Sequence, residues 1–336
     1  MASFSPEIAG SSSIEVGLLC GFHIRAGGGT REIEPRDISA AVADPDGVTW
    51  LHFNLSHSRA RQLIAQSDFL PEDVRDAFVN HVVHRRVAAI DGGILAEFSD
   101  LTFEEGSEPE EVAPLWSFVS DRLLVTGRTH PLQTPDRLRA AVRAGLVADT
   151  GFDLLVWLLA QRTSSLRDLA NDMSEQVGQI EDDILSGRIR EQREQLGRIR
   201  RFCAQLRRHF GPDRNAFRRL LQNPQNRLSA EIAEGLRLEV DELSFLVDEV
   251  LELYERSKLL QEELASRVAE STGRSLYVLA ILSAAFLPMT LITGIFGMNV
   301  AGMPGMTEHA AFWRVMLLIV AAGAMTLALI SRRDRG

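Results

Sequence analysis

Residues 293–305 have the sequence TGIFGMNVAGMPG, and this stretch decides what kind of protein the chain can form. An apolar run of membrane length ends here in Gly297, Met298 and Asn299. A glycine-rich turn follows, and a second apolar run begins soon afterwards. Because a bilayer core is crossed by about 20 consecutive apolar residues, this pattern predicts a membrane hairpin.

The two apolar runs are residues 276–296, which carry no charged side chain, and residues 311–330, which carry Arg314 near their start. We expect both to be transmembrane helices, rather than two buried helices of a soluble protein. The connecting loop, residues 297–310, has no Lys or Arg. The basic residues on the other side of the two runs are Arg267, Arg274, Arg332, Arg333 and Arg335. Since basic residues favour the cytoplasmic side, we expect both termini in the cytoplasm and the loop outside.

The composition limits the remaining possibilities. The formal net charge is −10, so nucleic acid is not expected as a partner. The chain has 2 cysteines and no spacing typical of a structural zinc site. No catalytic constellation is recognisable, so we expect neither an enzyme nor a bound cofactor. The start of the chain, MASFSPEIAGSSS, lacks the basic start and apolar core of a signal peptide, which favours a cytoplasmic N-terminal part.

Residues 1–150 are expected to form a cytoplasmic α+β domain. Short β-prone runs alternate with turn formers along IEVGLLCGFHI, VTWLHFNL, RRVAAI, GILAEFSDLTF, LWSFVS and RLLVTGR. The last four runs follow one another closely, which predicts antiparallel neighbours in an antiparallel or mixed sheet. Helices are predicted over 58–67 and 72–80, and the glycines at 27–29 are predicted to form a hairpin tip.

Residues 151–273 are expected to form a helical stalk. A first helix is predicted over 151–185, ending before Gly187, with a seam at steps of three or four formed by Leu155, Leu159, Arg162, Leu166, Leu169, Met173, Val177, Ile180 and Ile184. Residues 188–221 are predicted to form a second, arginine-rich helical segment. We interpret its charges as a solvated face, with contact to an acidic surface, such as 97–111, as the alternative. A third helix is predicted from Pro224 without a break to Phe296, a length of about 110 Å.

The first span has one distinctive face. Steps of three or four place six residues on it, and these are Leu276, Leu279, Ser283, Leu287, Thr290 and Gly294. The face is apolar toward the cytoplasm and becomes small and hydroxylic toward the outside. Two spans cannot enclose a hydrophilic path alone, so several copies must place this face around a shared axis. Ordinary helix packing through small residues is the alternative.

The end of the first span favours the pore. A helix terminus leaves carbonyl groups unpaired and carries partial negative charge. Gly297 permits backbone geometry that other residues resist, and Asn299 adds a neutral carbonyl oxygen. Repeated around an axis, these groups form a ring of acceptors for the water shell of a divalent cation, which Mg²⁺ gives up reluctantly. The first span contains no His, Cys, Asp or Glu, so an ion would pass hydrated and any proton coupling must use other groups.

At these residues the chain resembles a known family. FLPMTLITGIFGMNVAGMPG (286–305) is similar to the first-span ending of the CorA superfamily of divalent-cation transporters, whose common mark is Gly-Met-Asn. Within it, the Gly-x-Pro-Gly turn resembles the ZntB zinc transporters, where the magnesium branch has an acidic loop. Other stretches similar to that branch are WLHFNLSH (50–57), LPEDVRDAF (70–78) and LRRHFGPDRNAFRRL (206–220).

The resemblance implies a pentameric funnel in a bacterial inner membrane, with residues 274–331 as the membrane hairpin and the first span lining the pore. Gly297, Met298 and Asn299 would stand at the outer entrance. The transported ion would be Zn²⁺ or another divalent cation, and the partners would be the lipid bilayer and further copies of the chain. Glu308 and His309 depart from the family pattern, and we expect them either to form an outer ring that attracts zinc or to be exposed without a ligand role.

Two other functions remain open. One is a Mg²⁺, Co²⁺ or Ni²⁺ channel, which the same motif would serve. The other is a membrane-anchored coiled-coil scaffold or sensor without transport. Further metal ligands could come from pairs of residues in the first domain, although no pair completes a site. These pairs are Cys20 with His23, His52 with His57, and His81 with His84.

Overall fold

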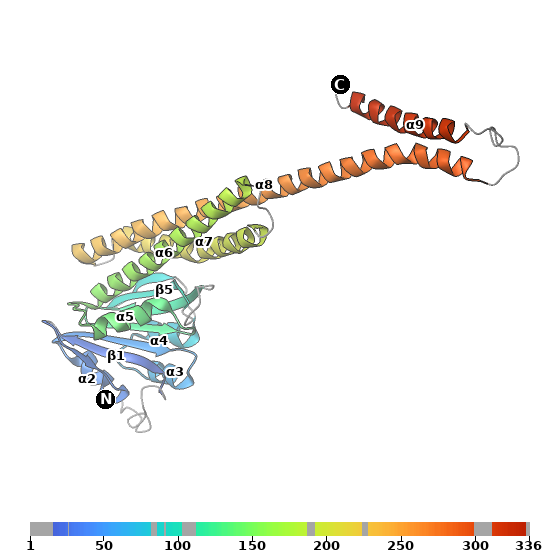
Figure 1. Cartoon of the computed structure of the whole chain (residues 1–336). Coiled ribbons are helices and arrows are strands. Elements are labelled where there is room, and N and C mark those ends of the chain that lie inside the picture. Colours follow the sequence, from blue (N-terminus) through green and yellow to red (C-terminus); the bar gives the residue numbers. More distant parts are fainter. Residues whose placement is uncertain are drawn as a thin grey trace. The chain divides into compact units, whose positions relative to one another are not determined.

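The structure is a computed structural model that describes residues 16–25, 27–81, 86–90, 92–102, 112–186, 192–223, 228–298 and 311–333. It divides into two compact units, Met1–Leu260 and Gln261–Gly336. Figure 1 shows the sheet with its helices in the first unit, and the end of one long helix with a further helix in the second.

The first unit is built on a mixed sheet. Within the described residues its strands are β1 (Leu18–Arg25), β2 (Thr30–Glu32), β3 (Gly47–Asn54), β4 (Val87–Ile90), β5 (Gly93–Leu101), β6 (Val112–Val119) and β7 (Leu123–Arg128). They form one sheet in the order β2-β1-β3-β7-β6-β5-β4. β3 and β7 pair in parallel, whereas the other described pairs are antiparallel. All six β-prone runs are strands, and the predicted antiparallel series from β4 to β7 is confirmed.

The sequence did not predict β2, because its three residues are all exposed and carry no apolar pattern. Its position follows from the turn before it. Gly27, Gly28 and Gly29 have φ of 95°, 97° and 116°, which side chains resist and glycine tolerates. The amide of Arg25 donates to the carbonyl of Gly29 at 3.1 Å, so these glycines form the predicted hairpin tip.

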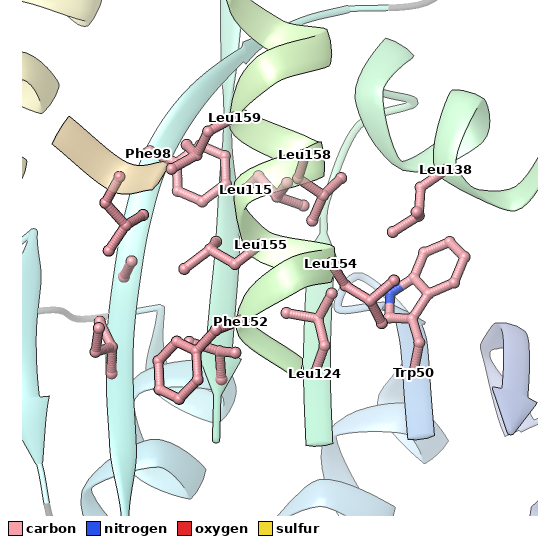
Figure 2. Packing of buried hydrophobic residues seen from close by; sticks show 14 of the residues in the cluster. Trp50, Phe98, Leu115, Leu124, Leu138, Phe152, Leu154, Leu155, Leu158 and Leu159 are labelled. Carbon is pink, nitrogen blue, oxygen red and sulfur yellow. The ribbon is translucent and has the colours of Figure 1, made fainter. Parts of the chain in front are cut away.

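Long helices cover one face of the sheet. They are α5 (Gln133–Arg143), α6 (Gly151–Leu185), α7 (Gln192–Gln222) and the first part of α8 (Ala230–Phe296). Figure 2 shows Leu154, Leu155 and Leu158 of α6 above side chains of the central strands, such as Leu124. The helix begins at a capping box, in which Asp153 and Thr150 satisfy each other's backbone N–H groups.

Shorter helices cover the opposite face. They are η1 (Pro35–Asp37), α2 (Ile38–Ala43), α3 (Ser58–Ala65) and α4 (Glu72–Asn80). Leu51 and Phe53 of β3 point into this second core, while Trp50 points into the first, as alternation along a strand requires. The helices predicted at 58–67 and 72–80 are therefore confirmed as the covering layer of a three-layer α/β/α unit.

A buried ionic cluster joins α6, α7 and β5. Asp213 accepts hydrogen bonds from Arg86 at 2.6 Å, from Arg162 at 3.2 Å and from the amide of Ser99 at 2.7 Å. Arg162 and Asp213 are almost completely buried. Arg162 was predicted on the apolar seam of α6. Its buried positive charge is compensated by the ion pair with Asp213. Most arginines of α7 lie on its exposed face, as expected for a solvated surface.

The predicted start of the third helix is wrong. Pro224 lies outside the described residues, and Leu228 and Ser229 precede the helix without being part of it. The Ser229 hydroxyl accepts a hydrogen bond from the amide of Ile232 at 3.2 Å, so this serine caps the first turn. α8 then runs from Ala230 to Phe296 over 67 residues, or about 100 Å at ~1.5 Å per residue. α9 (Ala311–Arg333) contains the second apolar run.

Candidate functional site

Among the described residues, two helices have segments in the second unit that are long and apolar enough to cross a membrane. The apolar end of α8 and the segment Phe312–Ile330 of α9 each have a window of which only 6% is buried within the chain. An apolar helix in water would bury such a window. This exposure fits helices that are covered by lipid or by other chains.

One face of α8 is covered by α9. Ala285 is buried there, and Ile281, Met289 and Ile292 are half-buried beside it. Gly323 of α9 lies directly against Met289, because a Cβ atom at Gly323 would collide with the Met289 Cε atom. A glycine at this place allows the two helices to approach closely, as small residues do in membranes.

The face predicted from the sequence lies on roughly the opposite side of α8, at ~100° of rotation per residue. Its six residues are all exposed, and Leu287 at its centre is 71% exposed. An open groove follows this face and is lined by Ser283, Phe286, Leu287, Thr290, Leu291, Gly294, Ile295 and Met298. The sequence did not single out Phe286, Leu291 and Ile295, since apolar side chains give no signal among other apolar residues.

Thr290 presents an oxygen acceptor on this face. Its hydroxyl donates to the carbonyl of Phe286 at 2.9 Å, so the proton is already used within the helix. The lone pairs of the oxygen remain to accept from water. Thr293, on a neighbouring part of the helix surface, donates in the same way to the carbonyl of Met289 at 2.8 Å. Such oxygens suit the water shell of a cation, which offers only donors.

The helix end differs from the expectation in one respect. The φ of Gly297 is not in the left-handed region, so this glycine is not needed there for its unusual backbone geometry. It is needed for space, because a Cβ atom would lie 2.9 Å from the carbonyl oxygen of Thr293. That carbonyl accepts from the Gly297 amide at 2.8 Å, and the carbonyl of Ile295 accepts from the Met298 amide at 3.4 Å. Asn299, Glu308 and His309 lie outside the described residues.

The suggested ligand pairs of the first unit do not converge. Cys20 and His23 belong to opposite faces of β1, and burial raises the pKa of the Cys20 thiol to about 12. His52 bonds to the Thr126 hydroxyl at 2.8 Å inside the first core, and burial lowers its pKa to about 3. His57 precedes α3 on the other face of the sheet.

The ring of His81 packs against that of Trp116 with the centroids 5.2 Å apart and the planes tilted by 32°, and its suggested partner His84 lies outside the described residues. The described residues contain no cluster of three or more His, Cys, Asp or Glu side chains able to hold a metal ion. The α8 face is therefore the better candidate site within the described part of the chain.

Comparison with known proteins identifies the family of the chain. The family model described as CorA-like Mg²⁺ transporter protein matches residues 45–333. The chain belongs to the CorA family. Among its relatives, the zinc transport protein ZntB of Yersinia enterocolitica is 26% identical over 300 residues, covering 87% of this chain and 88% of that protein. The divalent cation transporter CmaX of Pseudomonas aeruginosa is 27% identical over 310 residues, covering 92% and 93%.

The solved structures extend the likeness to the fold. The structure of the full-length CmaX protein superimposes with a TM-score of 0.79 at 26% identity, covering 95% of this CorA-family chain and 98% of that one. The predicted architecture of an α+β domain, a long helix and two apolar helices is thus confirmed. The likeness to the ZntB branch is also confirmed by the curated relatives.

Proposed function

We propose that this CorA-family protein carries Zn²⁺ across a bacterial inner membrane through a pore shared by five copies of α8. Membership of the family supports divalent-cation transport in general, and zinc is the narrower part of the proposal. The observation that carries it is the exposed face of α8 opposite α9, where hydroxyl and glycine positions interrupt an apolar surface. Contact of that face with lipid is unfavourable, whereas several copies of α8 around a shared axis would remove it from lipid.

Two kinds of residue line the proposed path. Leu276, Leu279 and Leu287 narrow it with apolar side chains. The small or hydroxylic residues Ser283, Thr290 and Gly294 widen it, and the two hydroxyl groups offer oxygens. Gly297, Met298 and Asn299 stand at the outer mouth. Since zinc prefers nitrogen and sulfur ligands and the face contains none, the ion moves with its water shell and is held loosely. This allows release as well as entry.

Two observations support zinc over magnesium. The relatives include ZntB proteins, and the stretch of the mouth and the turn that follows it, GMNVAGMPG (297–305), has no acidic residue. A Mg²⁺, Co²⁺ or Ni²⁺ channel is the second candidate, because the matching family model is described by Mg²⁺ and CmaX by divalent cations in general.

The proposal includes an arrangement in the membrane. Residues 1–150 form the cytoplasmic α/β domain, residues 151–273 the cytoplasmic stalk, and residues 274–331 the hairpin, with both termini in the cytoplasm. The support is the distribution of basic residues around the spans. Glu308 and His309 form an outer ring that raises the local zinc concentration. Replacing both with alanine raises the zinc concentration that gives half-maximal flux, and an unchanged value removes the ring from the proposal.

Flux into proteoliposomes tests the function. We expect zinc uptake by the purified protein, measured with and without a pH gradient and with Mg²⁺ as competitor. Asn299→Leu abolishes the flux and leaves the assembly intact, because it removes an acceptor ring at the mouth. If the Asn299→Leu variant transports zinc as fast as the parent protein, the proposed acceptor ring at the mouth is wrong. Uptake of Mg²⁺ in preference to Zn²⁺ favours the second candidate, and an intact oligomer without any flux favours a scaffold.

A further inference from the structure

The outer side of α8 in the first unit carries apolar side chains that its own chain leaves uncovered. Leu238, Phe245 and Leu259 are 62%, 66% and 63% exposed. They follow a seven-residue step, and Glu252 occupies the remaining position between them. A seven-residue apolar repeat is the pattern of a helix that packs against another helix. We call Leu238, Phe245, Glu252 and Leu259 the α8 ridge.

The ridge has acidic neighbours. Asp241, Asp248 and Glu255 are exposed beside it, each three residues beyond a ridge position. Two ridges that met face to face would therefore bring like charges together, which is unfavourable. The partner of the ridge should instead be an apolar surface with basic residues at its edge.

The same unit contains such a surface. A groove of about 430 Å³ lies between α6 and α7, and we call it the α6–α7 groove. Leu169, Met173, Ile199 and Phe202 form its apolar floor, and Arg198 and Arg201 stand on its rim together with glutamines and an aspartate. Arg201 is exposed and has no ion-pair partner within the described residues, whereas Arg198 is already bonded to Glu194 at 3.1 Å.

We propose that the α8 ridge of one copy docks into the α6–α7 groove of the next copy, with Phe245 in the groove and Glu252 beside Arg201. The charges of the two surfaces are complementary, and both are uncovered in the single chain. Ridge and groove are different surfaces of the same protein, so each copy offers one of each. Such head-to-tail contacts form a ring when the rotation from one copy to the next closes on itself. The inference rests on the proposed assembly and names the surfaces that would build it.

Disulfide trapping tests the contact in the full-length protein. Glu252→Cys combined with Arg201→Cys, the two positions that the proposed contact places side by side, gives an oxidised ladder of linked chains up to the full assembly. The parent serves as the blank, because burial raises the pKa of both native thiols, Cys20 and Cys203, to about 12. Glu252→Cys alone forms no linked dimer. Linkage by that single variant means that ridges meet each other at an axis, and this overturns the proposal.

Charge exchange gives a second, independent measurement. Glu252→Arg and Arg201→Glu each raise the chain concentration needed for assembly by roughly tenfold, and their combination restores it. Arg207→Glu is the control, since Arg207 is an exposed arginine of α7 outside the groove. Equal effects of Arg201→Glu and Arg207→Glu, without rescue, overturn the contact. An intact, transporting oligomer without the disulfide ladder overturns it while leaving the proposed function, whereas a monomeric parent without flux removes both.

Discussion

Replacing the hydroxyl group of Thr290 tests whether the ion passes in hydrated form. Its hydroxyl proton is bound to the carbonyl of Phe286, so the side chain offers the path only an acceptor. Thr290→Val keeps the shape and removes the acceptor. We expect zinc flux to fall about tenfold, since each lost hydrogen bond to an ion's shell costs ~1–2 kcal/mol.

Thr293→Val is the matched control for this prediction. Thr293 makes the same bond to its own helix and lies off the lining of the groove. Its replacement should leave zinc flux within about twofold of the parent. If both valine variants lose flux equally, the loss comes from the helix and not from the path.

His52 gives a prediction for the cytoplasmic unit under acid. Burial lowers its pKa from 6.5 to about 3, so the folded protein keeps it neutral while the unfolded chain binds a proton below pH ~6.5. Its contribution to stability is complete above pH ~6.5 and is lost as the pH falls toward 3. His52→Gln should remove a slope of ~1.4 kcal/mol per pH unit from the free energy of unfolding between about pH 6 and pH 4.

The measurement compares the two proteins by denaturant unfolding across this range. Burial raises the pKa of Asp100, which has the opposite effect on the slope, and the comparison cancels it because both proteins contain that residue. Parallel curves for parent and variant would show that His52 is protonated in the folded state.

At the scale of elements, Asp213 shows what periodicity alone does not reveal. The spacing placed Arg162 correctly on the inner face of α6, and Arg162 is buried there. Its partner lies 51 residues away on another helix, and no local pattern connects them. The start of α8 was missed for a related reason, since both Pro224 and Ser229 are good helix starters and only the folded chain selects one.

Asp213→Asn should destabilise the first unit by about 3–5 kcal/mol, because it leaves buried Arg162 with an uncompensated charge. The control is Glu32→Gln, which breaks the ion pair with Arg143 at 3.2 Å, where the glutamate is 62% exposed. That pair should contribute under ~1 kcal/mol. Thermal unfolding of both variants in detergent checks the difference, and equal losses would show that the buried cluster is no stronger than a surface pair.

At the scale of the whole molecule, the sequence predicted the chain's architecture but not its contacts with other copies. The spans, the sheet and the α8 face follow from composition and spacing, which act within a few turns or strands. The α8 ridge and the α6–α7 groove were not predicted, because an exposed leucine or arginine becomes informative only when the fold shows that its own chain leaves it uncovered. The number of copies is harder still to predict from sequence patterns, because it depends on the angle between successive interfaces.

Native mass spectrometry of the protein in detergent should therefore decide the assembly. The exposed α8 face, opposite the one that α9 covers, is shielded from lipid only if copies surround a common axis. Two different contact surfaces on each copy allow such a closed ring. We expect a single species of five chains, the number in the proposed pore. Phe245→Asp should shift it toward monomers, while Val147→Asp, an equally abrupt change at a 55% exposed site away from the ridge, should not. A stable dimer would contradict the ring, because a two-fold contact uses the same surface on both copies and leaves no axis for five α8 faces to share.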